Sequence, residues 1–471
     1  MRHHEVLNLM TSKSWFRISK RGFLFAAIAL VAIAVPLTWL AVKGLEGESP
    51  TLRWESPIHF IGPKTALKGT AFDQESGLRR LWIAILQQGR EVVLLDQEYP
   101  RALFKGEPVQ SQPVFVEINV RSLALEDGEA LLRAVVWDQS LRRRGAGNRA
   151  YEEQRVIIDT HPPEVDMISR QHNLNQGGAG LAIYRTSEPV TKSGVQVADR
   201  FFPGATGSLS DPNLFVAFFA IPHDTGPDAQ LYVMATDGAG NKTRVGFAHY
   251  INSRVFAQDT LNVPETFLKK KMPEFEGLLD KEKASASLLD KFLAVNRDVR
   301  QANHKTIEEV CKHSDTKLHW EGPFLRLPAS ARRAAFADHR TYEYEGDQVD
   351  SQTHLGIDLA STAHSPVPAS NSGRVAFAAN LGIYGKTVVI DHGFGLFTMY
   401  GHLSHIQATT GQIVSKGDII GSTGSTGLAG GDHLHFATLI HHTFVNPVEW
   451  WDPSWIKHNV TDKLKEIAHE G

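Results

Sequence analysis

The hydrophobic positions follow three different patterns in turn along the chain. Residues 23–42 form an uncharged apolar run. Apolar and polar residues then alternate in short runs between residues 48 and 255, as in Leu81–Leu86 and Leu131–Trp137, which is the pattern of half-buried β-strands. Between residues 256 and 345 apolar residues recur at helical spacing. The pattern therefore predicts an apolar helix, a long β-rich region and a partly helical segment, in that order.

The apolar run has the length of a membrane span, since a bilayer core needs about twenty apolar residues. Lys and Arg gather before it, whereas Lys43, Glu46 and Glu48 follow it. The positive-inside rule then predicts a cytoplasmic tail at residues 1–22, a transmembrane anchor at residues 23–42, and export of everything that follows. A cleaved signal peptide is the alternative. Because the run exceeds the usual apolar region of about 7–15 residues and no clean A-x-A site follows it, we expect an uncleaved anchor.

Two β-rich segments follow the anchor and resemble each other near their ends. The first, residues 48–160, contains the turn signal Gly145–Asn148, and the second, residues 161–255, contains Gly238–Asn241. The joint Asp159–Pro163 carries two prolines, which disfavour a helix and predict a stiff extended linker. Short alternating strands separated by turn signals are typical of β-sandwiches, so we expect tandem immunoglobulin-like modules.

Residues 256–345 differ in character from these modules. Four apolar residues recur at helical spacing with charged residues between them: Leu288, Phe292, Val295 and Val299. Pro264 and Pro273 mark interruptions before this helix. We expect a partly helical connector, which either packs as a collar beside the C-terminal region or covers a groove in it.

Composition limits the classes of protein to which the chain can belong. Its 471 residues allow roughly two to four domains. The formal net charge of −3 gives no global basic field, which argues against nucleic acid as a partner. The single cysteine, Cys311, cannot form an internal disulfide, so stability must come from packed cores. We expect Cys311 to be a buried apolar side chain rather than a nucleophile.

Two histidines near the C-terminus are spaced for one face of a strand. Strand side chains alternate, so His433 and His435 project from the same face, with Leu434 and Phe436 on the other. Two neighbouring imidazoles suit a metal ligand beside a proton-transfer group. The glycine-rich run Gly421–Gly431 before them lacks the endings of a phosphate loop and of a serine nucleophile elbow. We expect either a plain hairpin connection or a flexible loop that contacts a substrate.

Three further residues can join this pair. His354 and Asp358 flank Gly356, which permits a bend that turns both side chains toward one point. His402 follows a Tyr-Gly dipeptide. Hydrolytic zinc sites typically have three His or carboxylate ligands, an open position, and a further group that moves protons. Two histidines and one aspartate for the metal, with two more histidines for the chemistry, are what these five residues supply.

Other histidines of this region are expected to have other roles. His392 follows a predicted strand, and we expect it to hold a turn by hydrogen bonding. Four more are expected to face solvent or the rim of a groove: His364, His405, His441 and His442. The last two follow the His433–His435 strand closely enough to contact a substrate.

The segment from about residue 350 to residue 452 resembles the LytM/lysostaphin-type zinc endopeptidases of peptidase family M23, which cut peptide bridges in bacterial cell walls. The resemblance lies in the order of the five residues and in the text between them, including Gly373-Arg-Val, Val389-Ile-Asp-His-Gly and Asn446-Pro. It implies three ligands for one zinc ion per chain: His354, Asp358 and His435. It implies two residues that act on water and the transition state: His402 and His433.

These observations predict a mainly β protein with seven parts. They are a cytoplasmic tail (1–22), a transmembrane helix (23–42), two immunoglobulin-like β-sandwiches (48–160 and 161–255), a partly helical connector (256–345), an antiparallel β-sheet zinc peptidase domain (346–455) and a C-terminal tail (456–471). The resemblance implies hydrolysis of peptidoglycan cross-link peptides, with diaminopimelate-type cross-links favoured over glycine bridges. The anchor implies a single-pass protein of the inner (cytoplasmic) membrane whose catalytic domain faces the periplasm or cell wall. The β-sandwiches are then either a spacer or a binding site for an envelope protein.

Two other classes of protein would fit parts of the pattern. Some proteins with this fold have lost ligands and act as non-catalytic regulators that activate cell-wall amidases. An adhesin that carries a relic domain is the second alternative. All five site residues are present in this chain, which argues against both.

Overall fold

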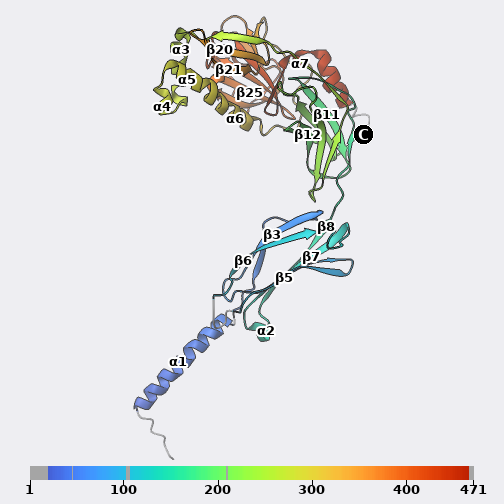
Figure 1. Cartoon of the computed structure of the whole chain (residues 1–471), viewed down its shortest axis with the longest axis vertical. Helices are drawn as coiled ribbons and strands as arrows, with labels where there is room; N and C mark the ends of the chain where they lie inside the picture. The colour runs from blue at the N-terminus through green and yellow to red at the C-terminus, as the bar shows by residue number, and fades with distance from the viewer. Residues whose placement is uncertain (1–19, 45, 102–106, 208–210, 466–471) are drawn as a thin grey trace, which may run out of the picture. The chain divides into compact units, whose positions relative to one another are not determined.

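The computed structural model divides into two compact units, residues 1–160 and residues 161–471 (Figure 1). It describes residues 20–44, 46–101, 107–207 and 211–465. Most of the predicted cytoplasmic tail, residues 1–22, lies outside the described residues.

The apolar run near the N-terminus is a helix. The helix α1 (Lys20–Gly44) contains Pro36 in its interior, and its window Arg21–Thr38 is long and apolar enough to cross a membrane. None of that window is buried within the protein, so no protein core covers its apolar side chains. A helix with these properties near the N-terminus is either a membrane anchor or a signal sequence.

Two β-sheets that share a buried core make up the rest of the first unit. One sheet has the strand order β1-β3-β6, and the other has the order β2-β8-β7-β4-β5. Leu67 of the first sheet and Ile83 of the second belong to the same apolar core. The elements are β1 (Thr51–Trp54), β2 (Phe60–Ile61), β3 (Lys64–Phe72), β4 (Leu78–Gln87), β5 (Arg90–Glu98), β6 (Ser111–Asn119), β7 (Gly128–Asp138), α2 (Arg142–Gly145) and β8 (Arg149–Ile158). The β-rich character is confirmed, and the immunoglobulin-like assignment stays a prediction.

The second unit begins with another β-rich region. Its sheets have the strand orders β14-β11-β9 and β13-β12-β15-β16, and β10 pairs with β17. The strands are β9 (Val165–Met167), β10 (His172–Asn175), β11 (Ala179–Thr186), β12 (Val190–Val197), β13 (Arg200–Pro203), β14 (Leu214–Ala220), β15 (Leu231–Asp237), β16 (Lys242–Gly246) and β17 (His249–Asn252). All of them lie within the predicted second module, residues 161–255.

This β-rich region shares its core with the C-terminal end of the chain. The ring centroids of Phe218 in β14 and Trp450 in α7 (Pro447–Trp451) are 6.0 Å apart. The buried carboxylate of Glu449 accepts hydrogen bonds from Asn175 Nδ2 at 2.7 Å and from the Ala179 amide at 2.8 Å. Packing therefore continues across the module boundary predicted at residue 255.

The connector is partly helical, as the spacing of its apolar residues predicts. Its elements are β18 (Gln258–Asn262), α3 (Glu265–Lys271), η1 (Met272–Leu278), α4 (Lys281–Ala284), α5 (Leu288–Ala294), η2 (Val295–Val299) and α6 (Arg300–Cys311). The Ser287 hydroxyl caps α5 by accepting the Asp290 amide. Cys311 is buried, and burial raises the pKa of its thiol, so the prediction that it is an inert apolar side chain is supported.

The C-terminal region is built on an eight-stranded antiparallel sheet with the order β19-β22-β30-β26-β25-β24-β28, in which β31 pairs with β30. Two smaller sheets, β18-β20-β21 and β23-β29-β27, accompany it. The elements are β19 (Ala331–Ala334), β20 (Asp338–Tyr344), β21 (Asp347–His354), β22 (Ile357–Ala360), β23 (Pro366–Pro368), β24 (Gly373–Asn380), η3 (Gly382–Tyr384), β25 (Lys386–Gly393), β26 (Leu396–Leu403), β27 (His405–Ile406), β28 (Ile413–Val414), β29 (Ile419–Ser422), β30 (Leu434–Ile440), β31 (Thr443–Val445), α8 (Pro453–Ile456) and η4 (Lys457–Thr461). Ile456 and Val460 are buried, so the predicted C-terminal tail starts with packed residues.

Candidate metal centre and active site

Three side chains converge at one point, two from the large sheet and one from the smaller sheet β18-β20-β21. His354 ends β21, Asp358 lies in β22 and His435 lies in β30, where it is paired directly with Asp358. His354 Nε2, Asp358 Oδ1 and His435 Nδ1 lie 3.0 Å from one another in all three pairs. All three residues are buried. Two imidazole nitrogens and one carboxylate oxygen at this spacing are a donor set that suits a divalent transition metal.

Burial and neighbouring charges set the protonation of these three residues. Burial alone would raise the pKa of Asp358, but the charge of His354 and hydrogen bonds from the surrounding histidines hold it well below its usual value. Burial lowers the pKa of His435 to about 4. An ionised carboxylate and a neutral imidazole are the forms in which these groups bind a metal.

Further contacts hold the three side chains in place. His354 Nδ1 donates to the Ala335 carbonyl at 2.9 Å, and Arg340 in β20 donates to Asp358 Oδ2 at 2.9 Å. Each of these bonds engages the atom that points away from the common centre, as is usual for groups that orient metal ligands. A Cβ at Gly356 would lie 2.5 Å from the ring of His435. Gly356 therefore has a steric role, because His435 packs against it. This role is additional to the backbone bend that we expected.

His402 and His433 form a second pair beside this centre. Their ring centroids are 4.8 Å apart, and His433 Nε2 lies 3.6 Å from Asp358 Oδ1. His402 Nδ1 is 2.9 Å from the Thr426 carbonyl, and His433 Nδ1 is 2.9 Å from the Gly431 carbonyl. Because a carbonyl only accepts, both Nδ1 atoms carry a proton, so in each neutral ring Nε2 is the nitrogen that carries the lone pair.

The environments of the two rings differ. Burial, reinforced by the charge of His433, holds the pKa of His402 well below its usual value. Burial also opposes the charging of His433. The hydrogen bond to Asp358 and the negative charge of that carboxylate outweigh the effect of burial, so the pKa of His433 is raised. His402 has a φ of +61°. A residue other than glycine in this left-handed region costs of order 1 kcal/mol or more, and such residues concentrate at functional sites.

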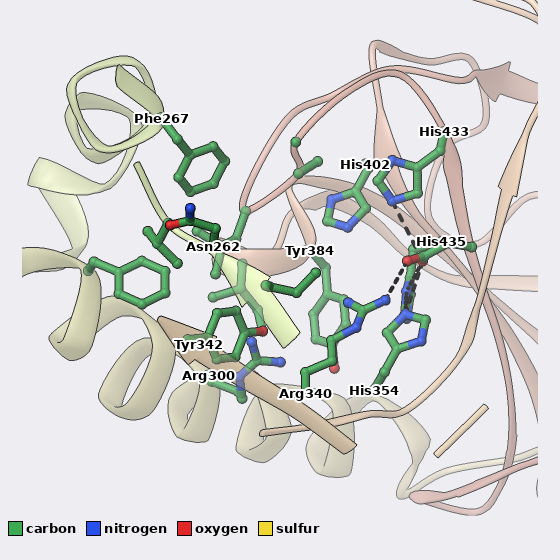
Figure 2. A pocket seen from close by; sticks show the side chains of 18 of the residues that line it. Asn262, Phe267, Arg300, Arg340, Tyr342, His354, Tyr384, His402, His433 and His435 are labelled. Carbon is green, nitrogen blue, oxygen red and sulfur yellow. Dashed lines mark hydrogen bonds and ion pairs between the residues drawn. The ribbon is translucent and has the colours of Figure 1, made fainter. Parts of the chain in front are cut away.

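All five predicted site residues line one cavity of about 370 Å³ (Figure 2). The connector supplies an apolar wall to it through Leu261, Val263, Phe267 and Phe292. The prediction left open whether the connector is a collar or a cover. In the structure it is a lining of the cavity.

The glycine-rich run before His433 also lines the cavity, through Leu428, Ala429 and Gly430. It is therefore more than a hairpin connection. Two residues of the connector bind this run by hydrogen bonds. Lys271 donates to the Ser425 carbonyl and, at 2.9 Å, to Glu274 Oε1. Glu274 Oε2 accepts the Gly427 amide at 3.1 Å. Since Thr426 and Gly431 accept the hydrogen bonds of the two histidines, the connector is linked through this loop to both rings.

The other histidines have mixed outcomes. His392 forms hydrogen bonds with the Ser372 carbonyl and with Thr398 Oγ1, both at 2.8 Å, as its predicted role requires. It is buried within β25, however, and does not follow that strand. His364, His405 and His442 are exposed as predicted. The prediction for His441 is wrong: its ring packs against Gly395 and Phe202, so it does not face solvent, and it is not part of the described lining of the cavity.

Several residues of the cavity were not found from the sequence. Arg340 and Arg300 carry its guanidinium groups, and the ring of Tyr384 lies with its centroid 5.4 Å from that of His435. None of the three belongs to a recognisable motif. One indirect signal could have pointed to Arg340, because it lies in a segment of alternating polar and apolar residues shortly before His354 in the sequence.

Buried histidines and an aspartate that converge beside two further imidazoles, at the wall of one cavity, are an arrangement typical of metallohydrolases. Residues 352–447 match the family model of peptidase family M23, so this part of the chain is an M23 peptidase domain.

Two curated relatives match the same part of the chain. The DD-carboxypeptidase/endopeptidase Mpg of Neisseria meningitidis is 43% identical over 95 residues, which are 20% of this chain and 22% of that protein. The peptidoglycan DD-endopeptidase ShyA of Vibrio cholerae is 40% identical over 96 residues, again 20% of this chain and 22% of that protein. The chain thus spans about a fifth of the length of the curated relatives that it matches.

Among solved structures, the catalytic domain of the antimicrobial peptidase lysostaphin from Staphylococcus simulans is 26% identical. The match covers 27% of this chain and 96% of that domain, with a TM-score of 0.24. A score this low gives no support to a shared architecture of the whole chain.

Proposed function

We propose that this protein is a zinc-dependent endopeptidase that hydrolyses the peptide cross-links of bacterial peptidoglycan. One observation carries the proposal: three potential ligand atoms converge at 3.0 Å beside two imidazoles whose Nδ1 atoms are held by backbone carbonyls. Relatives over the M23 domain that are named as peptidoglycan DD-endopeptidases support this substrate class. They also favour D,D-cross-links over glycine bridges.

The three ligands would be His354, Asp358 and His435, with one zinc ion per chain. Their two imidazole nitrogens and one carboxylate oxygen are the donors of hydrolytic zinc sites, and they leave one coordination position open. When bound there, zinc would polarise the scissile carbonyl and make a nearby water more acidic. Arg340 supports the site by engaging Asp358 Oδ2, which leaves Oδ1 directed at the common centre.

His433 is our candidate for the general base. Its Nε2 is directed toward the Asp358 side of the centre, 3.6 Å from Oδ1, and its Nδ1–H is fixed on a backbone carbonyl. In this role Nε2 takes a proton from the attacking water and passes it to the nitrogen that leaves as an amine. His402 would stabilise the oxyanion or share the proton transfer. The two histidines could exchange these roles.

A non-catalytic regulator that activates amidases is the alternative. Such a protein needs the fold of the domain without a complete reaction centre. In this chain all five side chains are present and line one cavity, which favours the enzyme over the regulator and over an adhesin with a relic domain.

The proposed location is the inner membrane, with α1 as an uncleaved single-pass anchor and the residues that follow it outside the cytoplasm. The apolar helix and the basic residues before it support this orientation. Protease added to spheroplasts should digest the M23 domain. If the domain is cut only after lysis, the orientation is inverted and a cell-wall substrate is untenable. An envelope protein that binds the β-rich modules is part of the proposal, as an alternative to a spacer role.

The function is tested with the full-length, zinc-loaded protein in detergent and purified peptidoglycan. Mass spectrometry of the released muropeptides should show cross-linked dimers converted to monomers. His433→Ala should abolish this conversion, whereas His405→Ala, which changes an exposed histidine outside the cavity, should not. Intact dimers after incubation with the wild-type protein would refute the endopeptidase assignment.

A further inference from the structure

The cavity at the candidate active site is cationic, although the chain as a whole is not. The formal net charge of the chain is −3. The described residues that line the cavity include two guanidinium groups, those of Arg300 and Arg340, and one carboxylate, that of Asp358. A zinc ion at the proposed centre would add two more positive charges. A cavity with this balance favours a ligand that carries negative charge close to the metal.

The two guanidinium groups are not equivalent. Arg340 donates to Asp358 Oδ2 and is thereby committed to a proposed metal ligand. Arg300, the first residue of α6, donates through Nε to the Asn296 carbonyl at 3.0 Å and through Nη2 to Asn296 Oδ1 at 2.6 Å. No described residue accepts a hydrogen bond from Arg300 Nη1. Arg300 therefore has donor capacity left for a ligand and holds no proposed metal ligand, whereas Arg340, whose buried Nε also has no hydrogen-bond partner among the described residues, is tied to Asp358.

The position of the Arg300 guanidinium is fixed by a buried amide. The Asn296 side chain is fully buried and donates through Nδ2 to Asp350 Oδ2 at 2.8 Å. This bond determines which side of the amide carries oxygen, so Oδ1 is the atom that faces Arg300. A guanidinium held in this way loses little side-chain entropy when it binds a carboxylate.

The surroundings of Arg300 fit a peptide with an aliphatic stem and an acidic end. In Figure 2 Arg300 and Tyr342 lie on the side of the cavity opposite His402 and His433. Phe267 and Phe292 of the connector also line the cavity and offer apolar contact. A substrate that spans the cavity would place its scissile bond near the histidines and meet Arg300 with a neighbouring group.

We propose that Arg300 is a specificity-determining residue that binds a free carboxylate of the substrate close to the scissile amide. This inference rests on the proposed function. In a D,D-cross-link to diaminopimelate, the carbon that bears the scissile nitrogen also bears a free carboxylate. A glycine bridge has no such group beside its internal amides. Binding between guanidinium and carboxylate would thus select the first kind of cross-link.

The test uses two synthetic peptide dimers with a D-alanyl–diaminopimelate cross-link. In one the carboxylate next to the scissile nitrogen is free, and in the other it is amidated. The full-length, zinc-loaded wild-type protein should cleave the free form with a kcat/KM about 10- to 100-fold higher, the usual effect of a hydrogen bond to a charged group. Arg300→Ala should lose that factor on the free dimer, change little on the amidated dimer and so show no preference.

Lys305→Ala is the matched control, because Lys305 is an exposed cation of the same helix outside this cavity. It should keep the wild-type preference. Equal cleavage of both dimers by the wild-type protein would overturn the inference and leave the proposed function standing. If Arg300→Ala still prefers the dimer with the free carboxylate, the inference is likewise overturned and the proposed function still stands. Cleavage of neither dimer by the wild-type protein would overturn the proposed function, and the inference with it. The wild-type comparison needs no variant, so it stands even if Arg300→Ala does not fold.

Discussion

Replacement of Lys271 by methionine is expected to slow catalysis without removing the metal. Lys271 lies in α3, outside the M23 segment, and its side chain is 3% exposed. Its ammonium group holds both Glu274 and the Ser425 carbonyl, and Glu274 in turn accepts the Gly427 amide. Methionine keeps the volume and the apolar stem of the side chain but provides no donor.

The magnitude follows from the bonds that are lost. A hydrogen bond to a charged group contributes about 1.5–3 kcal/mol. Because the Glu274 carboxylate is 41% exposed, water screens its share, and we assign about 2 kcal/mol to the pair of bonds together. This shifts the equilibrium between the ordered and the open glycine-rich loop by about 30-fold, since 1.4 kcal/mol corresponds to a factor of ten. Thr426 and Gly431 orient the two histidines that we propose to be catalytic, so kcat should fall by up to that factor.

The assay compares Lys271→Met with Lys269→Met, which changes an exposed lysine of the same helix. Turnover of a cross-linked peptide, zinc content and amide hydrogen exchange of residues 424–431 are measured for both. Lys271→Met should show reduced kcat and faster exchange in the loop, with zinc content unchanged, because the three proposed ligands lie on strands that Lys271 does not contact. Wild-type kcat together with wild-type exchange in the loop would refute the link between the connector and the histidines.

Three further outcomes are expected. His435→Ala should lose most of its zinc by elemental analysis; full retention would exclude His435 as a ligand. His402→Ala should keep its zinc and its fold but lose about 10²–10⁴-fold in rate, the usual contribution of a positioned acid–base group; loss of zinc would make His402 a ligand. Burial raises the pKa of Glu449 from 4.5 to about 7, so the folded state binds this proton more tightly than the unfolded state. The free energy of unfolding should fall by about 3 kcal/mol as pH rises from about 4.5 to about 7. Glu449→Gln should remove this contribution. If denaturation experiments give the wild-type and Glu449→Gln proteins the same pH dependence of the free energy of unfolding, the prediction is contradicted.

Local patterns and the family resemblance were enough to predict the β-rich regions, the helix of the connector and the five residues that the structure brings together in one cavity. The His433–His435 spacing places two imidazoles on one side of a strand whatever the rest of the fold is. Contacts between distant segments could not be predicted in this way. Arg340 reaches Asp358 only because β20 and β22 approach each other in space. The bond between Lys271 and Ser425 joins positions 154 residues apart, and no periodicity encodes it.

The wrong and incomplete predictions have the same origin. His441 follows a strand in a run of polar residues, which suggests solvent, but Phe202 from a distant strand covers its ring. Gly356 was interpreted through its own backbone freedom, whereas the side chain that needs its small size is His435, 79 positions later. In each case a neighbour that is remote in sequence determines the environment.

The shared core of the second unit has a consequence for the order in which the chain can mature. Phe218 and Asn175 are synthesised long before Trp450 and Glu449, their partners in the folded protein. Until the last residues of α7 emerge, Phe218 of β14 lacks its aromatic partner Trp450. Contacts of such high sequence separation make folding slow and leave intermediates prone to aggregation. The β-rich region 161–255 and the catalytic region should therefore reach their native state together, late, and with a need for protection by a chaperone in the meantime.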